Sequence, residues 1–364
     1  MRTAILTLPF HGNYGGIIQN YALQTALLRT GHEVETVNLK KSLLGKKFDI
    51  PFLTRAVRPD RSKDKQHVRR FIEENIRLTP PFYSKRDFLK YDFSKYDAVI
   101  VGSDQVWRAR YAYPDLYTCY LDFLKDRRVK KIAFSASFGS DTAEYTEQQI
   151  QTCGKLIGKF DLVTVREDSA LTLINDIYRW ECRNPPVLIS DPTILLHKED
   201  YMSLSSGYSR RENDGGLFYY ILDMTDEKRN LINKVSEELG VKPFTVIRKS
   251  RRWYDRLEDR MIPPLEEWLQ AFSQASYVLT DSFHGSVFSI IFNKEFTAVG
   301  NRKRGESRFL SLLARFNLPD RLVYDEKGIH SNLHNRIDWN SVNSMLDDER
   351  KRMTACLSYL DGLS

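Results

Sequence analysis

Residues 3–39 read TAILTLPFHGNYGGIIQNYALQTALLRTGHEVETVNL, and this stretch decides the fold class. Its first part, Thr3 to Pro9, is a short apolar run typical of a central parallel strand buried on both faces. A glycine-rich turn follows, and apolar residues then recur at helical spacing from Ile17 to Thr30, where Gly31 predicts the helix end. Polar and apolar residues alternate over residues 33–39, which predicts a second strand. The stretch therefore predicts one β-α-β unit.

The same alternation continues along the chain. In the first half, strands are predicted at residues 96–101, 131–135, 161–166 and 187–189, with helices near 144–158 and 169–176. In the second half, strands are predicted at 217–222, 243–247, 277–280 and 296–299, with helices near 226–239, 265–276, 286–292 and 309–316. This pattern is the signature of parallel sheets with crossover helices. We therefore predict an α/β protein with two Rossmann-like domains whose parallel sheets face each other across a cleft.

A length of 364 residues suits two domains. We expect the first at residues 1–200, on the acceptor side, with a basic, mostly helical insertion near 40–95. The second is expected at 215–335, on the donor side, after a polar connection at 197–216. An amphipathic helix at 338–361 is expected to pack back across both domains. Ligands of open α/β sheets bind at the carboxyl ends of the strands, so the chemistry is expected between the domains.

Composition excludes several classes of protein. A hydrophobic fraction of 41% and an aromatic fraction of 12% are globular values, which rules out a disordered or fibrous chain. No window of about twenty apolar residues exists, and the start lacks a signal-peptide pattern, so we expect a cytoplasmic protein. The cysteines are far apart, with no CxxC and no Cys/His ligand spacing, and they predict neither a structural metal nor a disulfide framework. They are Cys119, Cys153, Cys182 and Cys356.

The net charge of +7 attracts anions. Arginines cluster at residues 248–252 and 301–308, both just beyond predicted strands, and this placement favours an anion pocket over a nucleic-acid surface. No nucleic-acid partner is expected. Basic residues between Lys40 and Arg70 would allow peripheral contact with the inner face of a membrane, although a solvated basic face is the simpler interpretation.

Three polar stretches follow predicted strands, and the first is His11-Gly12-Asn13-Tyr14-Gly15-Gly16. Its glycines let the backbone approach a ligand, while the helix N-terminus faces an anion. Asn13, Gln19 and Asn20 add hydrogen-bonding groups that suit sugar hydroxyls. A tight turn that needs glycine for its backbone alone is the alternative.

The second stretch is Gly102-Ser103-Asp104-Gln105-Val106-Trp107. Trp107 offers a stacking face for a sugar, and the polar side chains at 103–105 suit its hydroxyls. Asp104 can act as a base if it lies within hydrogen-bond reach of an acceptor hydroxyl. The alternative is that Ser103 and Asp104 cap a helix while Trp107 lies in the core.

The third stretch is Thr280-Asp281-Ser282-Phe283-His284-Gly285, at a predicted strand-to-helix turn. Histidine titrates near neutrality and can donate or accept a proton, so His284 is the candidate catalytic residue. A structural histidine is the alternative. Because the chain has no GxSxG elbow, a serine-hydrolase triad is excluded.

In their order and spacing these stretches resemble the polysaccharide pyruvyl transferase family. Lesser patterns at 166–169, 190–193 and 307–313 resemble it too. The resemblance implies two Rossmann-like domains arranged as in GT-B glycosyltransferases. It also implies transfer of the pyruvyl group of phosphoenolpyruvate, bound mainly by the C-terminal domain, to two hydroxyls of a sugar or oligosaccharide. The product is a pyruvate ketal in a capsular, extracellular or cell-wall polysaccharide, and no metal or organic cofactor is implied.

His284 falls on the motif histidine of the family, which implies a general acid, with Asp104 or Asp281 as the base or orienting partner. Gly285 and Ser282 complete this predicted binding segment. Many members carry an arginine two residues before the histidine, where this chain has Ser282.

Another cation must then bind the phosphate or carboxylate of the donor, as arginine does best. We expect Arg248, Arg302 or Arg308 to supply it, because each lies just past a predicted strand of the same half.

Two other functions stay open. A GT-B glycosyltransferase that uses a nucleotide sugar would share the architecture, and the net charge alone would suit a non-catalytic basic protein that binds carbohydrate or polyanions. The sequence does not specify the acceptor sugar, its attachment to a lipid, or the oligomeric state.

Overall fold

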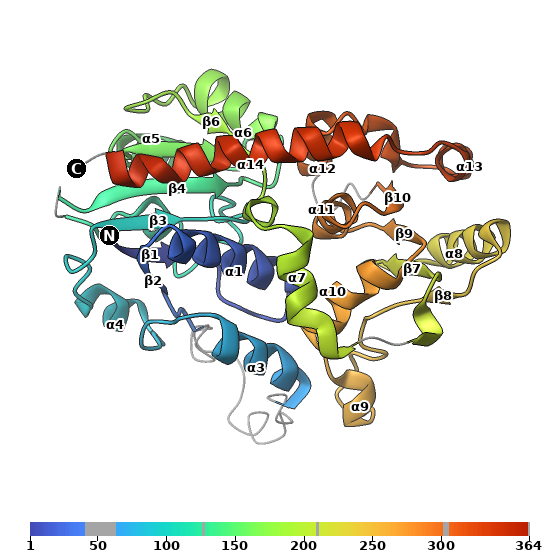
Figure 1. The fold of residues 1–364 in the computed structure, drawn as a ribbon. Helices are drawn as coiled ribbons and strands as arrows, with labels where there is room; N and C mark the ends of the chain where they lie inside the picture. Colours follow the sequence, from blue (N-terminus) through green and yellow to red (C-terminus); the bar gives the residue numbers. More distant parts are fainter. Residues whose placement is uncertain (41–62, 126–127, 209–210, 301–305, 363–364) are drawn as a thin grey trace.

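A computed structural model describes residues 1–40, 63–125, 128–208, 211–300 and 306–362. It contains a six-stranded sheet of order β2-β1-β3-β4-β5-β6 and a five-stranded sheet of order β11-β10-β9-β7-β8. Neighbouring strands run parallel throughout both sheets. The predicted α/β class with two parallel sheets is confirmed. In Figure 1 the sheets lie side by side, and the red helix α14 runs along both.

The first sheet and its helices come from the first half of the chain. Its strands are β1 (Arg2–Leu6), β2 (Glu33–Thr36), β3 (Ala98–Val101), β4 (Lys130–Ala136), β5 (Leu162–Val165) and β6 (Val187–Leu188). The helices of this half are α1 (Tyr14–Arg29), α3 (Gln66–Asn75), α4 (Lys85–Lys90), α5 (Glu147–Ile157) and α6 (Asp168–Thr172). A short 3-10 helix, η4 (Pro192–Leu195), and helix α7 (Lys198–Ser205) follow.

The second sheet is built from the rest of the chain. Its strands are β7 (Leu217–Tyr220), β8 (Pro243–Phe244), β9 (Tyr277–Thr280), β10 (Glu295–Val299) and β11 (Leu322–Val323). Its helices are α8 (Asp226–Leu239), α9 (Leu257–Arg260), α10 (Leu265–Gln274), α11 (Phe283–Ile291), α12 (Ser307–Arg315) and α13 (Glu326–His334), followed by α14 (Trp339–Gly362).

Two helices that reach the site begin three residues earlier than predicted. Helix α1 starts at Tyr14 rather than Ile17, because the extended backbone of Asn13 already serves as its N-cap. Helix α11 starts at Phe283, because the hydroxyl of Ser282 accepts a hydrogen bond from the backbone N–H of Gly285 at 3.3 Å and caps the helix. N-cap serine commonly satisfies such a free backbone donor.

Other segments also differ from expectation. The stretch 197–216, predicted as a polar connection, contains helix α7. Strand β11 was not predicted, because a strand of two residues is too short to show an alternation of apolar and polar residues. In the predicted insertion, helices α3 and α4 are present, and residues 41–62 lie outside the described residues.

Helix α14 packs its apolar face into the same hydrophobic cluster as β1 and α1. Its buried residues are Val342, Leu346, Glu349, Met353, Leu357 and Leu360. The carboxylate of Glu349 accepts hydrogen bonds from the backbone N–H of Ser190 at 2.7 Å and from Arg315 at 2.9 Å. One buried side chain thus joins the end of β6 to α12. Within the described ranges, no helix is both long and apolar enough to cross a bilayer.

Candidate active site

Three charged side chains meet at the carboxyl ends of three strands of the first sheet, β3, β5 and β6. Arg166 directly follows β5, and its guanidinium donates to Oδ2 of Asp191 at 2.7 Å and to Oδ1 of Asp104 at 3.2 Å. Asp191 follows β6, and Asp104 follows β3 with a left-handed backbone (φ +72°). All three residues are buried. Parallel strands bring their carboxyl ends to one edge, which is why residues so far apart in sequence converge here.

His284 reaches this cluster from the second sheet, in the first turn of α11. Its Nε2 lies 3.5 Å from Oδ2 of Asp191, at the outer limit of a hydrogen bond. The imidazole packs directly against the backbone of Gly15: a Cβ atom added to Gly15 would lie only 2.0 Å from Nδ1. The site therefore combines both sheets, with His284 held between Asp191 and the start of α1.

The electrostatics keep both aspartates ionised. Burial by itself raises the pKa of Asp104, but Arg166, His284 and Arg308 outweigh it and lower that pKa below the usual value. The pKa of Asp191 is likewise raised by burial and lowered, to a larger extent, by His284 and Arg166. Opposite charges at this range favour the charged form.

Arg308, on α12, brings a second guanidinium to the cluster. Its carbon Cζ lies 5.4 Å from the ring centre of Phe283, and Cζ of Arg166 lies 4.7 Å from the same ring. Burial, followed by the charge of Arg166, lowers the pKa of Arg308 to about 10. Arg308 therefore remains a cation at neutral pH.

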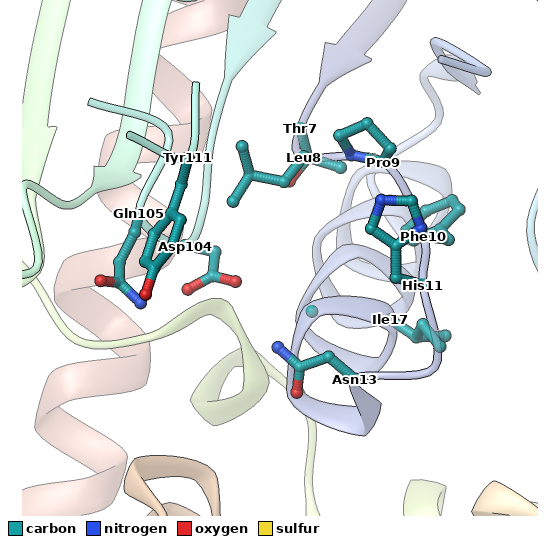
Figure 2. A pocket seen from close by; sticks show the side chains of 11 residues that line it. Thr7, Leu8, Pro9, Phe10, His11, Asn13, Ile17, Asp104, Gln105 and Tyr111 are labelled. Carbon is teal, nitrogen blue, oxygen red and sulfur yellow. The ribbon is translucent and has the colours of Figure 1, made fainter. Parts of the chain in front are cut away.

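A cavity of about 250 Å³ opens beside Asp104. It is bounded by the segment 7–11 after β1, by Asn13, Gly16 and Ile17 of the loop and helix α1, and by Asp104, Gln105 and Tyr111. Figure 2 shows the Asp104 carboxylate and the Asn13 amide facing the same space from opposite sides. His284 is not one of the lining residues, so the cavity belongs to the first sheet, with Asp104 at its boundary with the charged cluster.

Gln19 and Ser103 support the loop that carries Asp104. The backbone N–H of Ser103 donates to Oε1 of Gln19 at 3.1 Å, and the Gln19 amide donates to the carbonyl of Gly16 at 3.0 Å. The Ser103 hydroxyl donates to the carbonyl of Ser135 at 2.8 Å. Both side chains are fully buried. These hydrogen bonds hold the two loops together.

Residues 13–303 match the family described as Polysaccharide pyruvyl transferase. The chain belongs to the polysaccharide pyruvyl transferase family. The matched residues include Asp104, Arg166, Asp191 and His284, while Arg308 lies just beyond them. No curated protein matches the chain significantly.

The fold of this pyruvyl transferase family member is also similar to that of solved structures. It is similar to the UDP-GlcNAc 2-epimerase of Methanocaldococcus jannaschii, with 13% identity, 99% of this chain and 100% of that chain covered, and a TM-score of 0.58. It is similar to the UDP-GlcNAc 2-epimerase of Neisseria meningitidis, determined bound to UDP-GlcNAc, with 9% identity, coverage of 98% and 99%, and a TM-score of 0.56. At such identities the likeness shows the GT-B-like fold alone.

Three side chains predicted to serve in the site lie elsewhere. Trp107 is fully buried, stacked on Tyr120 at 5.0 Å between ring centres, so its predicted sugar-stacking face is covered. Asn20 faces β2, where its Oδ1 accepts from the Thr36 hydroxyl at 3.0 Å. Asp281 accepts from the backbone N–H groups of 222 and 223 and from Lys228 at 2.7 Å. Those donors hold the Asp281 carboxylate at the end of β7.

Other predicted residues shape the site from outside. Tyr14 donates to the carbonyl of Pro263 at 2.6 Å and thereby links α1 to the second half. Gly285 packs against Thr280, where a Cβ would lie 2.2 Å from the hydroxyl oxygen. Burial raises the pKa of Tyr14, and the nearby charge of Arg248 acts in the opposite direction. Arg302 lies outside the described residues.

The residues that the sequence did not assign a role are Arg166 and Asp191. Both belong to short patterns that the family resemblance covered. Arg166 is the last residue of the predicted strand 161–166, and Asp191 lies two residues after the predicted strand 187–189. Their position after adjacent parallel strands was the available signal, because carboxyl ends of such strands meet at one edge.

Proposed function

We propose that the chain is an enzyme that transfers the pyruvyl group of phosphoenolpyruvate to two hydroxyls of a sugar, forming a ketal. The proposal rests on family membership and on one observation in particular: His284 from the second sheet meets Asp191 and Arg166 from the first. An acid, carboxylates and buried cations are the groups that this reaction needs.

The reaction balances without a cofactor. A proton adds to the methylene carbon of phosphoenolpyruvate, and the oxygen of one sugar hydroxyl bonds to the adjacent carbon. The bond from that carbon to the phosphate oxygen breaks, and the second hydroxyl closes the ring. One of the two hydroxyl protons restores the acid, and the other protonates the departing phosphate. Phosphoenolpyruvate and a diol thus give a ketal and inorganic phosphate.

We assign the proton delivery to His284. The nearby Asp191 carboxylate orients the imidazole for this step, in the same way as a carboxylate orients a catalytic histidine elsewhere. Asp191, and not the Asp281 of the sequence prediction, is the partner that this geometry supports.

Asp104 is assigned to the acceptor. Because its pKa is lowered and it is paired with Arg166, it is a weak base, and it serves best by accepting a hydrogen bond from an attacking hydroxyl. Asn13, Gln105 and Tyr111 line the same cavity and offer further partners for sugar hydroxyls.

Arg308 is our choice for the cation that replaces the missing motif arginine. It is buried, positively charged at neutral pH, and lies with Phe283 beside the catalytic histidine. A fixed guanidinium in such a dry site stabilises phosphate as it leaves.

The test is release of phosphate from phosphoenolpyruvate against galactosyl, glucosyl and N-acetylhexosaminyl acceptors, followed by mass spectrometry. Ketal transfer gives a product heavier than the acceptor by pyruvic acid less one water, with one phosphate per product. Turnover of a nucleotide sugar in place of phosphoenolpyruvate would identify a glycosyltransferase instead. Salt-sensitive binding of polyanions with no turnover of either donor would identify a binding protein.

Replacing Gly15 with alanine is expected to lower the turnover number by about 10²-fold, because a Cβ atom there forces the imidazole of His284 out of position. Steady-state phosphate release measures the effect. Gly207→Ala is the control, since no atom lies within 4 Å of a Cβ at that glycine. Equal activity of the two variants would contradict the placement of His284.

A further inference from the structure

A second cluster of chemically competent side chains lies on the surface of the second half. Glu238, near the end of α8, faces His330 and His334 of α13. Its Oε1 lies 2.6 Å from Nδ1 of His330 and 3.0 Å from Nε2 of His334. One ligand atom from each of the three side chains lies within 4.8 Å of the others. All three residues are exposed to solvent.

The backbone holds these ligands together. His330 and His334 are four residues apart on one helix, so they share a face. Helices α8 and α13 pack on the same hydrophobic cluster, through Val235 and Leu333 among others. A second contact joins the helices where Lys234 pairs with Glu326 at 2.6 Å. The cluster therefore sits on two helices fixed by packing, and not on a loop.

We propose that Glu238, His330 and His334 form a binding site for a divalent transition-metal ion, and that zinc is its natural occupant. Two imidazole nitrogens and one carboxylate oxygen form a common zinc ligand set, with water in the remaining position. Both imidazoles already converge on the same carboxylate oxygen, so small side-chain rotations suffice to place the three atoms at the distances of about 2.0–2.2 Å that zinc needs.

The chemistry of the ligands also selects the class of ion. Imidazole suits zinc, copper, nickel and iron, whereas calcium and magnesium require a shell of oxygen atoms. The ion would join α8 to α13 across their exposed edge and stabilise that half of the protein.

The site goes beyond the proposed function, because none of its residues belongs to the active-site cluster. The proposal differs from the expectation from sequence that no structural metal is present. That expectation rested on the spacing of cysteines and histidines. It could not include this site, because Glu238 lies 92 positions before His330 in the sequence.

The test is isothermal titration of the full-length, chelator-treated protein with zinc chloride, repeated with cobalt(II) for its visible absorption. We expect one zinc per chain, a rise in the unfolding temperature with zinc, and a cobalt spectrum typical of nitrogen and oxygen ligands. His330→Ala and His334→Ala are each expected to weaken zinc binding by more than about tenfold, and Glu238→Gln by about tenfold or more.

The matched control is His67→Ala, which removes a histidine of α3 and should leave zinc binding unchanged. Glu238, His330 and His334 are all exposed, so their replacement removes no buried side chain. No zinc binding by the wild type, or equal binding by His330→Ala and the wild type, would overturn the proposal. These readouts use no substrate, so failure of the proposed transferase reaction would leave them unaffected.

Discussion

Replacing His284 with asparagine is expected to lower the turnover number for phosphate release from phosphoenolpyruvate by about 10²–10⁴-fold, the usual contribution of a positioned acid. Asparagine keeps polar atoms next to Asp191 but cannot deliver a proton at neutral pH. The protein should stay folded, since the side chain makes no short hydrogen bond among the described residues. Initial rates with the acceptor found in the panel measure the loss.

His32 provides a matched control for this experiment. It too is buried, and its Nε2 also lies 3.5 Å from an aspartate oxygen, that of Asp361. His32→Asn should retain wild-type turnover because the residue lies at the other end of α1, beyond its last turn. A fully active His284→Asn variant would refute the assigned role, whereas equal losses in both variants would show a general effect on structure.

Arg166→Met is expected to lower the free energy of unfolding by about 3–5 kcal/mol, because it leaves the buried carboxylates of Asp104 and Asp191 without their shared cation. Denaturant unfolding followed by circular dichroism measures the change. Activity should be lost as well, since Asp104 and Asp191 would no longer be held in place.

Arg183→Met is the control for the arginine itself. Arg183 pairs with Asp161 at 2.7 Å, the same distance as Arg166 from Asp191, but its side chain is 66% exposed. Exposed pairs contribute about 0–1 kcal/mol, so little stability should be lost. A similar loss in the two variants would contradict the claim that burial makes the Arg166 pairs important.

The same ion pairs determine how the stability of the protein changes in acid. The pKa values of Asp104 and Asp191 are lower in the folded state than the ordinary value of 3.8, so the unfolded chain binds more protons in acid. Their stabilisation is complete above that value and falls as the pH drops below it. Arg166→Met removes one of the cations that lower these pKa values, while His284 remains beside Asp191, so this part of the pH dependence should weaken without vanishing.

The sequence predicted the architecture because the strands of parallel sheets are short apolar runs with little ambiguity. The predicted strand at 96–101 contains β3, and all four residues of β3 are buried. The first residues of α1 and α11 were not predicted because they depend on the N-caps Asn13 and Ser282. The periodicity of apolar residues does not reveal the backbone conformation of an N-cap. The pair β10–β11 was missed because it involves two residues per strand in its register.

The candidate site was predicted less completely. A histidine after a strand can be found from its neighbours, and the structure places His284 beside charged groups. The carboxylate next to His284 could not be identified from sequence. Asp281 is only three residues away in the chain, whereas Asp191 is far away in the chain but close in space. Trp107 shows the opposite problem: an aromatic side chain that suits sugar stacking suits a buried core equally well, and its Nε1 donates inside that core to the carbonyl of Cys119.

Helix α14 has a consequence for the order in which the protein is made. Its apolar side chains complete the cluster around β1 and α1, and its Glu349 binds the backbone of Ser190 next to Asp191. On the ribosome, α14 emerges only after the whole second sheet has been translated. The hydrophobic cluster around β1 and α1 is therefore complete only after the second half has been synthesised, and so is the hydrogen bond of Ser190, next to the candidate site.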